Sequence, residues 1–222
     1  MILEANFKEI NHEIKADFGT VSVIGANQGA YDQGFTDGQQ AEYDRFWDDF
    51  QAKGKRSHYV YTFAYSGWGD ANFNPKYPIT PTTTSGIANM CTWNASITDT
   101  KVPITAYGSC QNAFGNATWL KRIPKLIFSG ATNVSNMFLN CGRLEELYCE
   151  GEITLSLSLA QSTKLTKASI ESIINALSAT ASGQTLTLSE AAVLQWWAPD
   201  GDISADFYVM CDEKPNWTIS LV

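Results

Sequence analysis

Residues able to act as nucleophiles or proton carriers are sparse in this chain. It contains two histidines, His12 and His58, and neither lies in a metalloprotease, nucleophile-elbow or phosphate-loop motif. A cysteine–histidine nucleophile pair would have to combine one of these with a cysteine that has no motif around it. The sequence therefore predicts a non-enzymatic protein with no catalytic, cofactor-binding or metal-binding residues.

The cysteines also lack a pattern that would indicate a bonded or metal-holding role. The five are Cys91, Cys110, Cys141, Cys149 and Cys211, and no Cys-x-x-Cys pair occurs. An odd, scattered set fits neither a disulfide framework nor a zinc site. We expect buried free thiols that pack as small hydrophobic groups.

Paired carboxylates are the more serious chemical candidates, because glycoside hydrolysis needs two of them about 5–10 Å apart. One group falls on the exposed face of a predicted helix, where solvated charge is the simpler interpretation, and the other lies beside glycines, where turn formation explains it. These are Asp44, Asp48 and Asp49, and then Asp70, Asp200 and Asp202. Since carboxylates distant in sequence can meet in space, a glycan-cleaving hydrolase stays as a third hypothesis.

Tryptophans could instead stack on sugar rings. The candidates are Trp68, Trp93, Trp119, Trp196 and Trp197. Aromatic residues near the edges of repeats more often complete the core, and we expect these to do so.

The composition and net charge limit the classes of partner that the chain is expected to bind. Hydrophobic residues make up 44% of the chain and charged residues 17%, which leaves a surface rich in Ser, Thr, Asn, Gln and Gly, as in secreted and virion proteins. A net charge of −8 argues against nucleic acid and against anionic membranes. No apolar stretch approaches a membrane span, and MILEANFKEINHEIK has no signal-peptide pattern. We expect location in a virion, outside the cell or at the cell surface.

Residues 1–54 are predicted to anchor and oligomerise the protein. Residues 1–27 suggest short strands, and residues 28–54 suggest one helix that carries aromatic residues and a stripe of small residues on its surface. Interior glycines cost about 1 kcal/mol each against alanine, so close packing of another backbone would explain them. The partner could be the chain itself or a second copy, with a trimer favoured, and alternatively the helix begins only near Gln39. The proposed contact residues are Ala30, Tyr31, Gly34, Phe35, Gly38, Tyr43, Phe46, Trp47 and Phe50.

Residues 55–85 are rich in aromatic residues and proline. The pairs Asn74-Pro75, Tyr77-Pro78 and Thr80-Pro81 favour extended backbone. We expect a long ordered connector that packs its aromatic side chains on the rest of the protein.

From residue 86 onward the chain repeats itself with a period near 24. Four apolar positions recur, each displaced by 24, and an asparagine stands two residues before each copy. The copies are Phe114, Ala117, Leu120 and Ile123, then Phe138, Cys141, Leu144 and Leu147, with Asn112 and Asn136 ahead of them. A weaker upstream copy runs through Cys91, Asn94, Ile97 and Thr100, after Asn89. Such a period predicts a leucine-rich-repeat solenoid over residues 86–222.

The C-terminal part predicts a helix–strand cap. Thr166 can cap a helix with Ile170, Ile173, Ile174 and Leu177 on one face, which would end at residues 181–183. Residues 185–188 read as a strand, and Ser189 can cap a short helix through Leu194. In the tail, the alternation of Phe207, Val209, Trp217, Ile219 and Leu221 predicts one or two more strands. The fold class predicted for the whole chain is α+β.

These motifs carry a resemblance. Residues 136–147, residues 163–189 and the segment YDQGFTDGQQAEYDRFWDDFQ (31–51) resemble BspA-like leucine-rich-repeat proteins of gut bacteria and their phages. The resemblance implies surface attachment and, in phages, a tail or fibre module. The partners expected from it are other virion proteins and a bacterial surface glycan or protein. The alternative is a bacterial surface or secreted adhesin, and the small number of repeats departs from the family pattern.

Overall fold

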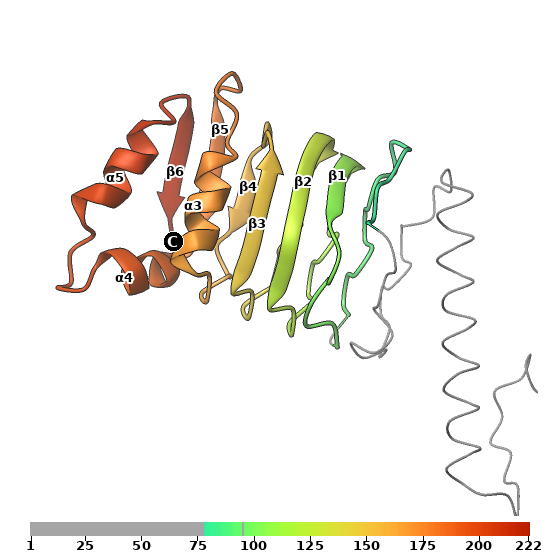
Figure 1. Cartoon of the computed structure of the whole chain (residues 1–222), viewed down its shortest axis with the longest axis horizontal. Helices are drawn as coiled ribbons and strands as arrows, with labels where there is room; N and C mark the ends of the chain where they lie inside the picture. Colours follow the sequence, from blue (N-terminus) through green and yellow to red (C-terminus); the bar gives the residue numbers. More distant parts are fainter. Residues whose placement is uncertain (1–77, 95) are drawn as a thin grey trace, which may run out of the picture. The chain divides into compact units, whose positions relative to one another are not determined.

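The computed structural model describes residues 78–94 and 96–222, all of which fall within one compact unit of the chain. Two parallel three-stranded sheets and three helices make up this part (Figure 1). The first sheet contains β1 (Ile104–Ser109), β2 (Arg122–Asn133) and β3 (Glu146–Gly151), and the second contains β4 (Leu157–Leu159), β5 (Gln184–Leu188) and β6 (Trp217–Leu221). The helices are α3 (Lys167–Asn175), α4 (Glu190–Trp197) and α5 (Ala205–Asp212). The predicted mixture of helix and strand is confirmed.

The number of residues between paired strands is smaller in the first sheet than in the second. In the first sheet Ile104 pairs with Leu126 and Leu126 with Cys149, so the spacing of neighbours is close to the repeat period found in the sequence. In the second sheet Leu157 pairs with Leu186 and Leu186 with Ile219, so more chain separates each strand from the next. The two sheets run in opposite directions (Figure 1). We call a strand of the first sheet (the outward element), together with the return segment that leads to the next strand, a coil.

The repeated positions form the core of the first half. All eight side chains from Phe114 to Leu147 that define the two good copies are at most 1% exposed, and so are the four of the upstream copy. Phe114 and Phe138 stack with their ring centroids 5.7 Å apart and their planes 7° apart. The period of 24 therefore places like side chains on top of one another in successive coils.

Asparagines let the return segments turn without helix or strand. Asn89, Asn112 and Asn136 adopt φ values of 56°, 53° and 55°, a left-handed conformation that asparagine tolerates better than most residues. The Asn112 amide donates to Asn89 Oδ1 at 3.0 Å, and the backbone N–H of Asn112 donates to the Ser135 carbonyl at 2.9 Å. Successive coils are therefore bonded on this side through both side chains and backbone.

Helix α3 begins where the sequence predicts. Thr166 is its N-cap and accepts a hydrogen bond from the Ser169 N–H at 3.3 Å. Ile170, Ile173 and Ile174 are buried, but the helix ends at Asn175, before the predicted stop at residues 181–183. Leu177 instead forms a parallel bridge with Ile153. Ser189 stands at the N-cap position of α4 as predicted, but its side chain makes no capping hydrogen bond, and α4 continues to Trp197 rather than ending at Leu194.

The prediction for the tail was half wrong. Trp217–Leu221 is strand β6, but Phe207 and Val209 lie in helix α5. Ser204 stands at the N-cap and Asp206 in the first turn, where a negative charge favours a helix. Phe207 is buried against Trp197, with centroids 5.3 Å apart, whereas Val209 is exposed, so the apparent alternation did not reflect a shared face.

Residues 1–77 and residue 95 lie outside the described part. The expectations for the anchoring segment, for its contact residues from Ala30 to Phe50, and for most of the connector therefore stay predictions.

Candidate functional site

The outward face of the first sheet presents a mixed aromatic and charged surface. Inward-facing Leu126 and Leu147 are buried, and the alternation of strand residues sends Tyr107, Ile127 and Tyr148 to the other side. Lys125 and Glu150 form an ion pair of 2.7 Å across β2 and β3.

Helix α3 takes the place of a fourth strand beside β3. The Ser169 hydroxyl accepts from the Leu147 N–H at 3.0 Å, and the Ser172 hydroxyl accepts from the Cys149 N–H at 2.8 Å. The same hydroxyls donate to the Glu145 and Cys149 carbonyls, at 3.1 and 3.3 Å. The two serines therefore satisfy the open edge of the first sheet, which would otherwise offer unpaired groups to another chain.

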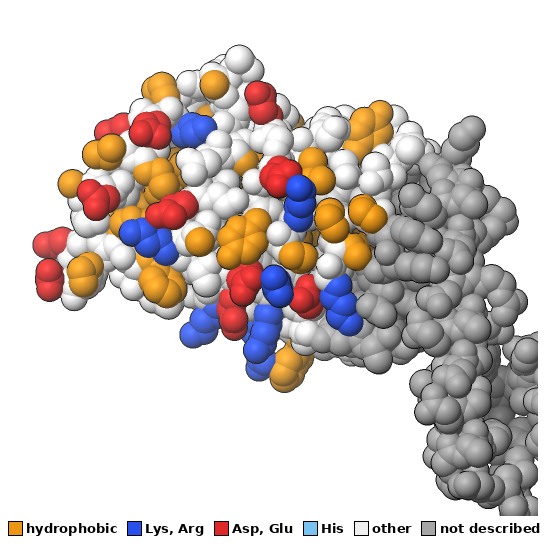
Figure 2. All heavy atoms as spheres, in the orientation of Figure 1, with side chains coloured by type: hydrophobic (Ala, Val, Ile, Leu, Met, Phe, Trp, Pro, Cys, Tyr) orange, Lys and Arg blue, Asp and Glu red, His pale blue; other side chains and the backbone are white. Residues whose placement is uncertain are grey.

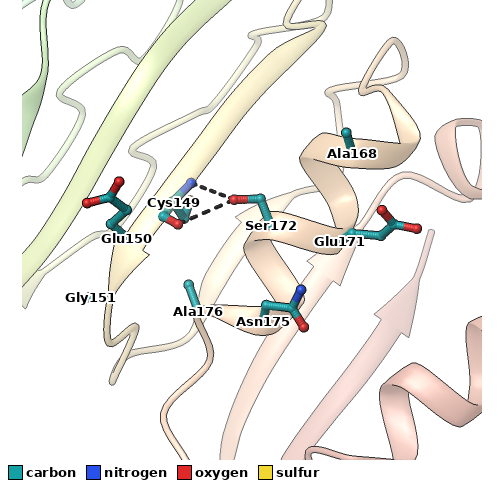
Figure 3. Close-up of a pocket in the computed structure, with 8 residues that line it drawn as sticks. All are labelled: Cys149, Glu150, Gly151, Ala168, Glu171, Ser172, Asn175 and Ala176. Atoms are coloured by element: carbon teal, nitrogen blue, oxygen red, sulfur yellow. Dashed lines mark hydrogen bonds between the residues drawn. The ribbon is translucent and has the colours of Figure 1, made fainter.

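A groove of about 650 Å³ lies between β3 and α3 (Figure 3). Its lining includes small residues, among them Gly151 and Ala176. Gly151 has a φ of +75°, and a Cβ there would lie 2.1 Å from the Phe128 carbonyl oxygen. Glu150 comes from β3, and Glu171 and Asn175 come from α3, with the Glu150 and Glu171 carboxylates pointing away from each other (Figure 3). These groups can hydrogen-bond to hydroxyl, amide or ammonium groups of a ligand.

Sequence reasoning missed this groove. Glu150 and Glu171 belong to different elements, and no local spacing connects them. Among the carboxylates proposed for glycan cleavage, Asp200 and Asp202 are exposed in the segment between α4 and α5. Asp44, Asp48, Asp49 and Asp70 lie outside the described residues.

The expectation that the tryptophans complete the core was wrong for three of them. Trp93, Trp119 and Trp196 are 56%, 46% and 40% exposed, whereas Trp197 is 3% exposed. Trp93 occupies the position of Asn116 and Asn140 in the following coils, and all three have a positive φ. That position faces outward, so the indole cannot reach the core. Trp68 lies outside the described residues.

The exposed Trp119 is held by a cation. The guanidinium carbon of Arg143 lies 3.6 Å from the centre of its ring, a cation–π contact between neighbouring coils. Trp196 is fixed differently, because its indole N–H donates to the Leu165 carbonyl at 2.9 Å.

All five cysteines are free thiols, as predicted. Cys91, Cys110, Cys141 and Cys149 are buried, and burial raises the pKa of the Cys141 and Cys149 thiols to about 12. Cys211 is partly exposed, and desolvation followed by the nearby Asp212 raises its pKa to about 11. These thiols are therefore protonated near neutral pH and act as packing groups.

The described residues contain no group of three or more His, Cys, Asp or Glu side chains placed to hold a metal ion. No helix in this part of the chain is long and apolar enough to cross a membrane. In the comparisons with known proteins, no family model, no curated protein and no solved structure matched the chain.

Proposed function

We propose that residues 86–222 form a short BspA-like leucine-rich-repeat solenoid with a helix–strand cap. Three features support this: parallel pairing at a spacing close to the sequence period, the Phe114–Phe138 stack, and the asparagine bonds between coils. Helices α3 and α5 then take the outward place that strands hold in the first half. The return strands β4, β5 and β6 complete the cap.

We propose that the protein is a non-enzymatic structural or receptor-binding component of a phage tail or a similar surface appendage. Residues 1–54 would anchor the chain in a homo-oligomer, a trimer for preference, and contact other virion proteins. The repeat body would bind a bacterial surface glycan or protein.

The groove between β3 and α3 is the observation that carries the binding role. It is lined by small residues together with residues that carry carboxylate and amide groups, and it lies beside the aromatic outward face of the first sheet. The serine-capped edge holds the helix wall against the strand wall through bonds of 2.8 and 3.0 Å. A surface whose walls are fixed before binding loses little freedom when a ligand docks.

Cell binding by the full-length chain tests the proposal. Fluorescently labelled protein is incubated with a panel of gut bacterial isolates and measured by flow cytometry. Ala168→Arg fills the groove from α3, and we expect it to lower the apparent affinity for bound isolates about tenfold. Gln111→Arg adds the same charge at an exposed return-segment position and should leave binding unchanged. Binding to no isolate, or equal effects of both variants, would contradict the proposal.

A further inference from the structure

A second surface, separate from the groove, follows the turns that lead from the return segments into the outward elements. Residues 98–101, 119–122, 143–146 and 164–167 form successive turns. The Lys121 N–H donates to the Thr98 carbonyl at 2.8 Å, the Glu145 N–H to Lys121 at 2.8 Å, and the Thr166 N–H to Glu145 at 2.9 Å. Neighbouring turns therefore lie side by side, about 4.8 Å apart as adjacent strands do.

These turns are basic although the protein is acidic. They contain six lysines and arginines against three acidic residues, in a chain of net charge −8. Arg122 pairs with Asp99 at 3.8 Å and with Glu146 at 3.0 Å, and the four turns together carry three more positive than negative charges. Residues 190–222, in contrast, hold six acidic residues and one lysine. Figure 2 shows several lysines and arginines along the lower rim of the molecule, with acidic side chains among them, and further acidic groups at the far end.

Exposed indoles accompany the cations on this rim. Trp119 lies under Arg143, and Lys167 Nζ lies 5.2 Å from the ring centre of Trp197, next to the exposed Trp196. The bond from Trp196 to Leu165 brings α4 to the turn at residues 164–167. We call this surface the basic–indole edge, made of Trp119, Lys121, Arg143, Lys164, Lys167 and Trp196.

We propose that the basic–indole edge binds an acidic polysaccharide, a chain of sugar rings with separated carboxylate or phosphate groups. An indole offers an apolar face to the C–H groups of a sugar ring, and Lys and Arg pair with the anions. Glu145 lies on the same edge and repels a ligand with contiguous charge. A DNA duplex carries one charge per about 1.7 Å, so it fits this edge less well. The inference is independent of the groove and of the role proposed for it.

Affinity electrophoresis of the full-length chain in gels containing defined polymers tests the assignment. The probes are polygalacturonate and poly(glycerol phosphate) teichoic acid, with dextran as the neutral polymer and duplex DNA as the competing polyanion. We expect both acidic polysaccharides to retard the protein and dextran to have no effect. Retardation should weaken as salt rises from about 0.05 to 0.2 M.

Substitutions locate the site. Lys164→Gln and Trp119→Ala should each weaken binding of the acidic polymers about tenfold. Ser182→Glu makes the same change in net charge as Lys164→Gln but lies in the exposed turn between α3 and β5, and it should leave binding unchanged. A thermal melt of each variant verifies that it is folded.

Four results would overturn the proposal. These are equal retardation by dextran, tighter binding of DNA than of either acidic polysaccharide, equal weakening by Lys164→Gln and Ser182→Glu, and no retardation by either acidic polymer when the protein is folded. Tighter binding of DNA would assign the edge to nucleic acid instead.

Discussion

In the proposed solenoid, the two halves of the described body build their coils from different outward elements. In the first half, β1, β2 and β3 face outward, and paired strands recur at close to the sequence period. In the second half more chain separates paired strands, and α3 and α5 stand between the return strands. A helix rises about 1.5 Å per residue and a strand about 3.3 Å, so a helix needs roughly twice as many residues to cover the same height. Helix α3 lies in the chain between β4 and β5, and α4 and α5 lie between β5 and β6, which lengthens both separations.

The change of element also creates the groove. A helix with its side chains is about 10 Å across, whereas neighbouring strands are separated by about 4.8 Å. Helix α3 cannot continue the sheet smoothly, and a step forms where it meets β3. The junction between the two kinds of coil is thus where a binding surface arises. We call the part that contains β1, β2 and β3 the strand-fronted half and the part from α3 to β6 the helix-fronted half.

The largest effect is expected from the phenylalanine stack of the strand-fronted half. Phe138→Ala should lower the free energy of unfolding by about 3–5 kcal/mol, because the side chain is fully buried and leaves a cavity. Urea unfolding of this variant, of Phe114→Ala and of the double variant should give a coupling of about 0.5–1.5 kcal/mol from the stacked rings. Strict additivity would mean that the coils do not support one another here.

A glycine from each half gives the next comparison. Gly151→Ala should destabilise the protein by about 2–3 kcal/mol, because the new Cβ adds a clash with the Phe128 carbonyl to the strain of a positive φ. Gly183, in the helix-fronted half, has a φ of +69° but no atom within 4 Å of an added Cβ. Gly183→Ala should therefore cost only the strain, about 1 kcal/mol. Equal losses in urea unfolding would contradict the close approach at Gly151.

The junction between β3 and α3 depends on the hydroxyls of Ser169 and Ser172. Ser172→Ala leaves the Cys149 N–H without its partner and should cost about 1–2 kcal/mol. Hydrogen exchange should show faster exchange at the Cys149 amide, while β1 and β2 keep their protection. Ser182→Ala, at an exposed turn, is the matched control and should change neither quantity. Unchanged protection at Cys149 in Ser172→Ala would show that the helix does not cap this edge.

The smallest expected effect is a gain in stability, from a substitution at Trp93. Trp93→Asn should raise the free energy of unfolding by about 0.5–1 kcal/mol, because asparagine adopts the left-handed conformation with less strain and the indole is largely exposed. A loss of stability in urea unfolding would mean that the indole packs on the protein.

Sequence reasoning found the parts of the fold that repeat or have local signals. The spacing of Phe114 and Phe138 identified the stacked core, and Thr166 with the isoleucines after it identified α3. It failed where the outcome depends on neighbouring coils. Trp93 is exposed because its left-handed position is bonded to the Gly115 carbonyl of the next coil, and nothing near residue 93 signals this. The groove was invisible for the same reason, since its lining residues on β3 and α3 come together only through the packing of α3 on β3.

Light scattering tests most directly whether the protein is an oligomeric component of a surface appendage. The intact chain and a chain lacking residues 1–54 are measured at micromolar concentration, with circular dichroism to verify folding. We expect a trimer or larger for the intact chain and a folded monomer for the shortened one. If both are monomers, residues 1–54 do not oligomerise the protein, and the proposal of an oligomeric appendage component is contradicted.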